Sequence, residues 1–408
     1  MQNNKKKKVT KYKKPNWFIY HFFRFLCVLI SKFIINTKIE KNELKKVKGP
    51  YVIIANHESI IDFINIAIIN RNRIHFVMSS SFYHGMKLNP LLKLIRAIPK
   101  QQFQTLPSDL KAMKNVILNN GAISLFPAGL MPESGISTPI VKGTAKALKW
   151  FGVDVYLAKT EGSYFTKPKW SKKTRKGKIR YNITKLFDTE QLKDLSNDEI
   201  AEIMDKNLYF DSYKNQERNM IPYKNGNDVE GLENVLYVCP KCKQEFTIYH
   251  NEGKLICRNC NNTAYADKYG FLLKEKETDI IYKNVSDWVR FIEEYLYEKV
   301  KEEPSYNMVG HGKISMINHK KHQFEVVGDA CVTLDSTKFT LKGLLNNEPF
   351  EKEFSIREFQ VLPFTPGKFF EIQDGKDIYR ILLDNNIEIS KWIHLLKVYY
   401  RINHENKE

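Results

Sequence analysis

Cysteine is scarce in this chain of 408 residues, and the six that occur do not form a disulfide framework. Four make two Cys-x-x-Cys pairs, which leaves Cys27 in an apolar run and Cys331 in a segment typical of a strand. A small disulfide scaffold is therefore excluded, and a reducing compartment is favoured. Because 42% of the residues are hydrophobic, a wholly disordered chain is also excluded, and the length favours two or three domains.

Acidic residues are nearly absent from two stretches of this basic chain, whose formal net charge is +19. Residues 1–50 hold 14 Lys and Arg against Glu40 and Glu43, and residues 167–180 hold eight Lys and Arg with no acid. The rest of the chain is close to neutral. Two local basic stretches favour contact with an anionic surface at defined places.

The second basic stretch contains Trp170, a residue that favours membrane interfaces, so we expect a loop on lipid headgroups. A solvated loop is the alternative. Nucleic acid is the rival partner, but the sequence lacks helix-turn-helix spacing and an RNP-type aromatic motif. We therefore expect an anionic membrane surface as partner and no nucleic acid.

The apolar run at residues 17–35 has no small-residue cleavage site after it, although seven lysines precede it. A removed signal peptide is thus disfavoured. As a spanning helix it would carry Arg24 into the bilayer, at a cost of about 2.5 to 3.5 kcal/mol. The lysines before and after the run would also prefer the same cytoplasmic side, which a single crossing forbids. On a helical wheel His21, Arg24, Ser31 and Lys32 form a narrow polar stripe. Residues 1–38 therefore predict a basic tail and an interfacial helix, peripheral or monotopic on the cytoplasmic face of a membrane; a buried core helix is the alternative.

The next segment alternates short apolar strands with helices. Strands are expected at 51–55, 73–78, 122–126, 153–158 and 178–187, and helices near 59–70, 89–97, 108–118, 139–150 and 196–214. We expect the last helix to be capped by Asn197 or Asp198. This order predicts an α/β domain with a largely parallel sheet. Sites in such sheets lie at the carboxyl ends of the strands, so the loops after residues 55 and 126 are the candidates.

The loop after residue 55 carries His57 and, five positions later, Asp62. With His57 at the strand end and Asp62 in the helix, the carboxylate can orient one imidazole nitrogen while the other acts as a base. In the alternative interpretation, Asn56 and His57 only cap the helix and Asp62 is solvated. No Ser or Cys nucleophile motif accompanies the histidine, and a hydroxyl such as Ser59 in a first helical turn is more often a cap.

Four segments resemble the PlsC-like glycerolipid acyltransferases, the 1-acylglycerol-3-phosphate acyltransferases in particular. NHESIID at 56–62 resembles the family's NHxxxxD motif, FPAGLMPESG at 126–135 its FPEGTRS block, and KGTAKALKWFGVDVYLAKTEG at 142–162 the segment that follows; RAIPKQQF at 96–103 matches only loosely. The resemblance spans about residues 40–215. It implies acyl transfer from a thioester, on coenzyme A or acyl carrier protein, to a hydroxyl of a lysophospholipid-type acceptor.

Under this resemblance, His57 is the general base, Asp62 orients it, and no covalent acyl-enzyme forms. Backbone amides around Gly129 are candidates for stabilising the oxyanion. The chain departs from the family pattern at Ala128, Leu130 and Met131, so the usual phosphate clamp is missing. Either the acceptor has no phosphomonoester, or other residues supply the charge, with Lys100, Lys142 and the 167–180 stretch as candidates. The predicted substrate-binding residues are Asn56, Lys100, Phe126, Pro127, Gly129 and Glu133.

A polar linker follows residue 216, and then four cysteines with strict spacing. Cys239, Cys242, Cys257 and Cys260 form C-x2-C-x14-C-x2-C between two predicted hairpins, which is typical of a zinc ribbon. Four thiolates leave no open position for water, so we expect structural zinc. A redox dithiol pair and iron are the alternatives.

The remainder predicts an amphipathic helix at 284–302, many antiparallel strands from Gly310 onward, and a terminal helix with Trp392 on its apolar side. This arrangement resembles the pleckstrin-homology superfold, which implies binding of lipid headgroups or of a protein partner, or a spacer role. The expected domains are 1–38, the anchor; 39–222, the acyltransferase domain; 232–272, the ribbon; 273–303, a linker helix; and 304–408, the pleckstrin-homology-like domain. Two other functions stay open: a non-catalytic lipid-surface scaffold and a zinc-ribbon nucleic-acid binder.

Overall fold

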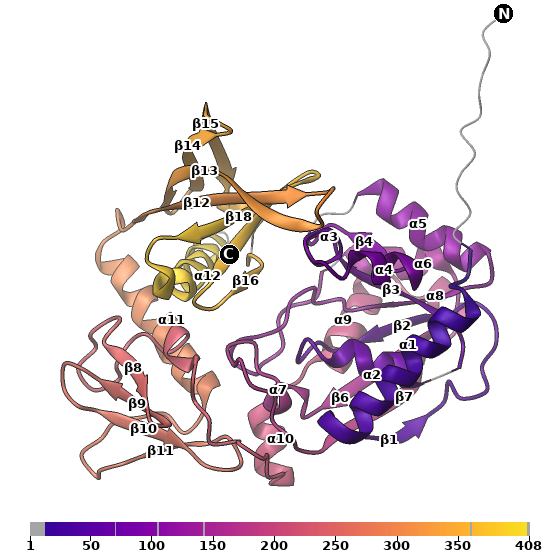
Figure 1. Cartoon of the computed structure of the whole chain (residues 1–408), viewed down its shortest axis with the longest axis horizontal. Coiled ribbons are helices and arrows are strands. Elements are labelled where there is room, and N and C mark those ends of the chain that lie inside the picture. Colours follow the sequence, from indigo (N-terminus) through magenta and orange to yellow (C-terminus); the bar gives the residue numbers. More distant parts are fainter. Residues whose placement is uncertain (1–12, 70, 104–105, 142, 360, 406–408) are drawn as a thin grey trace, which may run out of the picture.

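A computed structural model describes residues 13–69, 71–103, 106–141, 143–359 and 361–405. The basic tail before residue 13 and Lys142, a candidate for the acceptor charge, lie outside the described residues. In the described residues, three β-sheets follow one another along the chain: seven strands near the N-terminus, four in the middle and seven near the C-terminus (Figure 1).

The first sheet has the strand order β1-β7-β6-β2-β5-β3-β4. Its strands are β1 (Thr37–Asn42), β2 (Val52–Ala55), β3 (Ile74–Ser79), β4 (Ile98–Lys100), β5 (Ala122–Leu125), β6 (Val155–Glu161) and β7 (Ile179–Phe187). All neighbours pair in parallel except β6 and β7. The predicted α/β domain with a largely parallel sheet is thus confirmed. The central strand β2 is buried along its whole length, as expected for a sheet covered on both faces.

Helices cover both faces of this sheet because alternate side chains of each strand point to opposite sides. One core joins Ile53 and Ala55 to α1 (Trp17–Ile30), α2 (Asp62–Ile69) and α4 (Asn89–Leu94). The other joins Val52 and Ile54 to α5 (Pro107–Leu118), α6 (Gly143–Phe151) and α9 (Asn197–Leu208). The shorter helices are α3 (Ser80–His84), α7 (Ser163–Thr166), α8 (Thr189–Asp194) and α10 (Ser212–Asn219).

The helix predicted over residues 196–214 is in fact two helices. α9 ends at Leu208 because the backbone of Tyr209 is no longer helical (φ −58°, ψ 137°), and Asp211 then caps α10 by accepting a hydrogen bond from the amide of Lys214. The N-cap of α9 is Ser196, not Asn197 or Asp198 as expected. Ser196 and Glu199 form a reciprocal capping box, which satisfies two amides at once.

Helix α1 and the π-helical turn Ser31–Ile35 that follows it are the only described segment long and apolar enough to span a bilayer. The α1 side chains Tyr20 and Cys27 are buried against the sheet core, and Arg24 donates a hydrogen bond to the carbonyl of Ile68 at 3.1 Å. Arg24 and Ser31 of the polar stripe therefore face the protein, whereas Lys32 is exposed. The opposite face exposes Phe18, Phe22, Phe25, Leu26, Leu29 and Phe33.

The middle sheet, of order β11-β10-β9-β8, is the small unit around the four cysteines. It consists of β8 (Ile248–Asn251), β9 (Lys254–Cys257), β10 (Thr263–Ala266) and β11 (Leu272–Lys274), all antiparallel. The turn between β8 and β9 uses positive φ at Glu252 and Gly253 (45° and 79°), as tight hairpin turns require. Helix α11 (Val285–Glu302) follows, close to the predicted bounds, with Asn284 as its cap.

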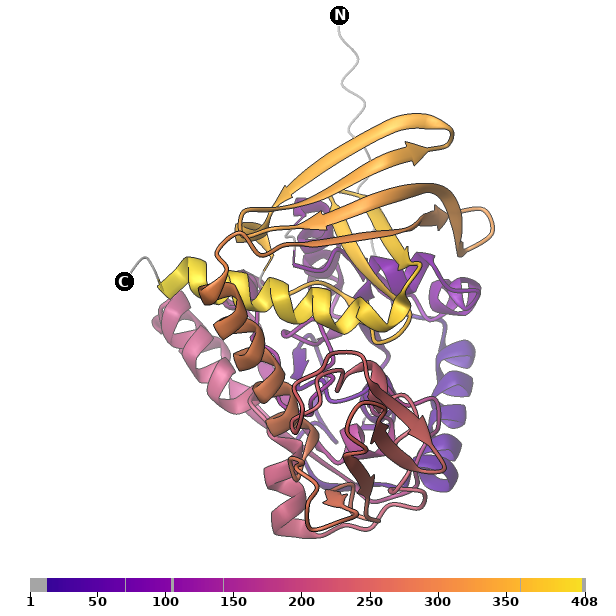
Figure 2. The ribbon, with the colours of Figure 1, turned by 90° about the vertical axis from the view of Figure 1, so that its left-hand side faces the viewer.

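The C-terminal sheet is antiparallel and has the order β15-β14-β13-β12-β18-β17-β16. Its strands are β12 (Met308–Asn318), β13 (Gln323–Leu334), β14 (Lys338–Leu345), β15 (Glu348–Ser355), β16 (Phe364–Thr365), β17 (Phe369–Asp374) and β18 (Asp377–Leu383). The terminal helix α12 (Ile389–Glu405) buries Trp392 against Phe370 and lies beside α11 (Figure 2). The predicted antiparallel domain with a terminal helix is confirmed.

Candidate active site

His57 and Asp62 meet where β2 passes into α2. Asp62 is the first residue of α2, and its Oδ2 atom lies 3.0 Å from Nδ1 of His57. The same oxygen accepts a hydrogen bond from the amide of Ser59 at 2.8 Å, which holds the carboxylate in place. Asp62 is buried, whereas the His57 side chain is 17% exposed. The structure thus has the pairing that the five-residue spacing predicts.

The loop after β5 lies against this pair, because β5 is the parallel neighbour of β2. The ring of Phe126 stacks on the His57 ring, with the centroids 4.1 Å apart and the planes inclined by 20°. Nδ1 of His57 is occupied by Asp62, so Nε2 is the ring nitrogen available to a ligand. An imidazole fixed on two sides is suited to taking a proton from a bound hydroxyl.

His57 lines a cavity of about 570 Å³. Most of its wall is apolar and comes from both faces of the first sheet, including Phe23, Phe63, Phe76, Leu92, Met113, Leu125 and Leu148. Of the predicted substrate-binding residues, Lys100, Phe126, Pro127 and Gly129 line this cavity. The volume and the apolar wall suit a small molecule with a long hydrocarbon part.

Residues of the C-terminal sheet close one side of the same cavity: Pro363, Phe364, Phe369, Glu371 and Arg380. Glu371 accepts a buried hydrogen bond from Ser81 at 2.7 Å and pairs with Arg380, also at 2.7 Å. No local sequence pattern signals this contribution of the C-terminal sheet, since these residues lie about three hundred positions from His57.

Two predicted substrate-binding residues do not line the cavity. Asn56 is buried and uses its side-chain amide to join β2 to β6. It donates a hydrogen bond to the carbonyl of Thr160 at 2.9 Å and accepts one from the backbone amide of Thr160 at 2.8 Å.

The backbone amide of Gly129, a residue that does line the cavity, donates a hydrogen bond to the carbonyl of Phe126 at 3.0 Å. That amide is therefore engaged, and is not a free donor for an oxyanion.

Glu133 is the second residue that lies away from the cavity wall. It is buried, and its Oε1 atom is 2.9 Å from Nζ of Lys397 and 3.4 Å from Nε2 of His394, both on α12. Burial alone raises the pKa of Glu133, but Lys397 and His394 outweigh burial and hold that pKa well below its usual range. Instead of contacting the cavity, Glu133 joins the loop after β5 to the C-terminal helix.

Glu58 is a buried acid beside the pair that the sequence analysis did not single out. Its Oε2 atom accepts a hydrogen bond from the amide of Tyr164 at 3.0 Å, which ties the loop of His57 to α7. Burial, and then the nearby Asp62, raise the pKa of Glu58 well above its usual range. The sequence feature that could have identified Glu58 is its position directly after His57.

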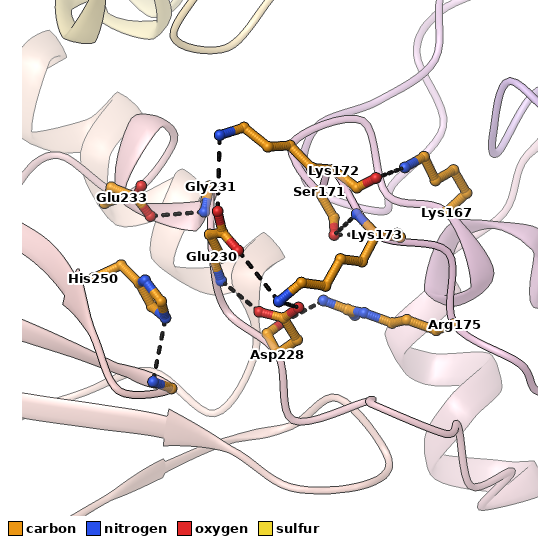
Figure 3. A network of polar contacts seen from close by, with 11 residues as sticks. Lys167, Ser171, Lys172, Lys173, Arg175, Asp228, Glu230, Gly231, Glu233 and His250 are labelled. Carbon is orange, nitrogen blue, oxygen red and sulfur yellow. Dashed lines mark hydrogen bonds and ion pairs between the residues drawn. The ribbon is translucent and has the colours of Figure 1, made fainter.

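The 167–180 stretch packs against the chain instead of presenting Trp170 to lipid, which corrects our expectation. Trp170 is only 7% exposed, and the guanidinium of Arg175 lies 4.9 Å from its ring. Lys173 pairs with Asp228 at 2.9 Å, and Lys172 with Glu230 at 3.7 Å (Figure 3). Acids about 55 positions downstream thus pair with Lys172 and Lys173 of this basic stretch.

The four cysteines form one cluster whose sulfurs all lie within 4.8 Å of one another. Cys239 and Cys260 are 3.7 Å apart at their Sγ atoms, as are Cys242 and Cys257. Four sulfurs at about 2.3 Å from a tetrahedral zinc ion would be separated by about 3.8 Å, so the cluster fits zinc. The amides of Lys243 and Asn261 donate to the carbonyls of Cys239 and Cys257, which closes both tight turns.

Residues 36–156 match the model of the family described as Acyltransferase. No curated protein matches the chain. Among solved structures, it is similar to the 1-acyl-sn-glycerophosphate (LPA) acyltransferase PlsC from Thermotoga maritima, with 16% identity and a TM-score of 0.39 over 47% of this chain and 76% of that one.

Proposed function

We propose that this protein is a membrane-associated glycerolipid O-acyltransferase. It moves a fatty acyl group from a thioester, on coenzyme A or acyl carrier protein, to a hydroxyl of a lysophospholipid or related glycerolipid. The observation that carries the proposal is the His57–Asp62 pair in the wall of a large apolar cavity, within a segment of the acyltransferase family.

His57 acts as the general base in this reaction. Its Nε2 atom takes the proton of the acceptor hydroxyl as that oxygen attacks the thioester carbonyl carbon. The C–O bond forms, the C–S bond breaks, and the leaving thiolate takes the proton back from the imidazolium. Buried Asp62 stabilises the imidazolium and keeps the proton of the neutral ring on Nδ1.

The membrane contact is made by the exposed face of α1. Its phenylalanines and leucines lie beside a cleft of about 360 Å³ whose lining includes Trp17, Lys14, Lys48, Arg71 and Arg73. Apolar side chains next to cations suit the interface of a bilayer with anionic headgroups. We assign the protein to the cytoplasmic face of a membrane, bound as a peripheral or monotopic protein.

The cysteine cluster holds structural zinc in this proposal. Cys239, Cys242, Cys257 and Cys260 supply four thiolates, so no coordination position remains for water or substrate. The ion would contribute folding free energy to the four-stranded unit, because the ligands come from two separate turns.

Acyl transfer by the full-length protein tests the catalytic proposal. We expect His57→Ala to lower kcat/KM about 10² to 10⁴-fold with acyl-CoA and lysolipids in mixed micelles, since the base is lost. Asp62→Asn should also lower the rate, because it removes the charge that stabilises the imidazolium. Product is measured by lipid mass spectrometry.

His311→Ala is the matched control, because His311 is exposed on β12, away from the cavity. Circular dichroism and thermal melting should show that all three variants remain folded. If His57→Ala keeps wild-type turnover, or if the wild-type protein transfers no acyl group from either carrier, the protein is instead a lipid-surface scaffold on an acyltransferase fold.

A further inference from the structure

Lys169 is a cation inside the cavity that His57 lines. Its Nζ atom donates a hydrogen bond to the carbonyl of Met131 at 3.2 Å and lies 3.6 Å from the ring centroid of Phe364. Met131 follows β5 in the acyltransferase domain, whereas Phe364 begins β16 of the C-terminal sheet. The ammonium group therefore sits where the two domains meet.

The ammonium of Lys169 has only neutral direct partners. In the described part of the chain, no carboxylate forms an ion pair with it within 4.0 Å, and nearby Glu133 is paired with Lys397. Burial lowers the pKa of Lys169 to about 8, so the group is still mostly charged at neutral pH. Lys169 is partly buried, and a partly buried cation without a direct counterion is costly, so a bound anion would lower that cost.

The other cations of the cavity wall are already engaged. Arg380 pairs with Glu371, and its guanidinium lies 3.4 Å from the ring of Phe324 and 3.9 Å from the ring of Phe369. Lys100 donates to the carbonyl of Gln101 at 2.8 Å, and Asp109 is its nearby acid. Lys169 is thus the cation best placed to meet an anionic ligand.

The segment that carries Lys169 is attached to the loop of His57. Ser59, two residues after the histidine, donates a hydrogen bond from its hydroxyl to the carbonyl of Lys167 at 2.7 Å. An acceptor held at Lys169 by its charged end would therefore extend within the same cavity toward the base. A glycerol backbone, with a charged group at one carbon and a free hydroxyl at the next, has this layout.

We propose that Lys169 binds the negatively charged phosphate of the acceptor, and that Phe364 makes the C-terminal domain part of the acceptor site. This inference rests on the proposed function, because it assigns the acceptor class of the same cavity. It follows that the protein prefers acceptors with a phosphate group over neutral ones. It also follows that Lys169 acts mainly on acceptor binding, and little on the chemical step.

The test compares two acceptors with the same acyl chain, a monoacylglycerol 3-phosphate and the corresponding monoacylglycerol. We expect Lys169→Gln to raise KM for the phosphate-bearing acceptor about 10- to 100-fold, as for the loss of a charged hydrogen bond, with kcat nearly unchanged. Turnover of the neutral acceptor should change less than threefold, about the scatter of surface substitutions. Lys169→Arg should keep most of the selectivity, and Phe364→Leu should lower it while keeping the cavity wall apolar.

Lys172→Gln is the matched control, since Lys172 lies in the same basic stretch but is paired with Glu230 at the surface. It should leave both KM values unchanged. Equal losses of Lys169→Gln on both acceptors, or no loss on either, would overturn the proposal. If Lys169→Gln does not fold, the KM values for the two acceptors are compared between the wild-type protein, Lys169→Arg and Phe364→Leu.

A binding measurement separates this inference from the proposed function. Glycerol 3-phosphate should raise the melting temperature of the wild-type protein and of Lys172→Gln, but not that of Lys169→Gln. If the wild-type protein turns over neither acceptor, the proposed function fails, and the melting shift still decides whether Lys169 binds phosphate. No shift in the wild-type protein would count against the phosphate site itself.

Discussion

At the residue scale, the contrast between Asp62 and Glu133 shows what short spacing predicts. Asp62 lies five positions from His57, within one strand-to-helix turn, and the two side chains do meet. Glu133 lies in a block that resembles an acceptor-binding motif, yet its partners are 261 and 264 positions away on α12. Local geometry places the first acid, whereas the docking of another domain places the second.

Glu133 should therefore contribute to stability more than to substrate binding. We expect Glu133→Gln to lower the unfolding free energy by about 1 to 3 kcal/mol at pH 7, because a charged hydrogen bond to Lys397 is lost. The pKa of Glu133 is lowered in the folded protein, so its contribution is present above the unfolded value of about 4.3 and is lost as the pH falls through the folded value. The difference from wild type should thus shrink in acid.

Thermal melts of both proteins between pH 3 and 8 measure this effect. Glu230→Gln is the control, since Glu230 pairs with Lys172 and Lys173 at the surface. This substitution should change the unfolding free energy by less than about 1 kcal/mol. A Glu133→Gln protein as stable as wild type at pH 7 would show that the pair with α12 is energetically neutral.

At the element scale, α1 is the helix whose exposed face is apolar. The amphipathic pattern predicts a helix with one polar stripe, and the structure places Arg24 and Ser31 of that stripe against the protein. The residues left exposed are mainly aromatic and aliphatic, with Phe22 at 64% and Phe25 at 54% exposure. Such a contiguous apolar face on a basic protein is suited to a bilayer.

Replacing Phe22 and Phe25 together by serine should weaken binding to vesicles. Each buried phenylalanine contributes about 1.5 to 3 kcal/mol, so the double variant should bind vesicles with anionic phosphatidylglycerol at least tenfold more weakly in a flotation assay. The fold should be unaffected, because both side chains are exposed. The double variant Val326→Ser and Leu344→Ser, at exposed positions of the C-terminal sheet, is the control, and equal binding by both would argue against α1 as the anchor.

At the scale of the whole molecule, the packing joins parts that are far apart in the sequence. One core combines Tyr164 and Tyr213 of the α/β part with Val238 and Leu255 of the cysteine unit and Trp288 of α11. The indole of Trp288 donates to the carbonyl of Val238 at 2.9 Å, next to the first cysteine. Loss of order in the small unit is therefore transmitted to the rest of the chain.

We expect one zinc ion per chain, and a lower melting temperature when it is lost. Cys242→Ser should reduce the zinc content, measured by mass spectrometry of the metal, and should lower the melting temperature because the two turns are no longer crosslinked. Cys331→Ser is the control, since Cys331 lies on β13 outside the cluster. If the wild-type protein melts at the same temperature with and without zinc, the structural role of the zinc ion is contradicted.

Much of the fold and of the candidate site follows from local patterns. The alternation of strands and helices predicts the parallel sheet, the five-residue spacing predicts the His57–Asp62 pair, and the two Cys-x-x-Cys turns predict the cluster. In each case the interacting groups belong to one turn, or to loops at the same edge of a sheet.

The tertiary structure alone decided the rest. It buried Trp170 among the basic residues, engaged Glu133 with α12, and brought Lys169 over Phe364 from a strand almost two hundred positions later. These outcomes depend on how the C-terminal domain docks, and docking buries side chains through contacts that have no fixed spacing in the sequence. Periodicity and motif spacing report only what neighbouring residues impose on one another.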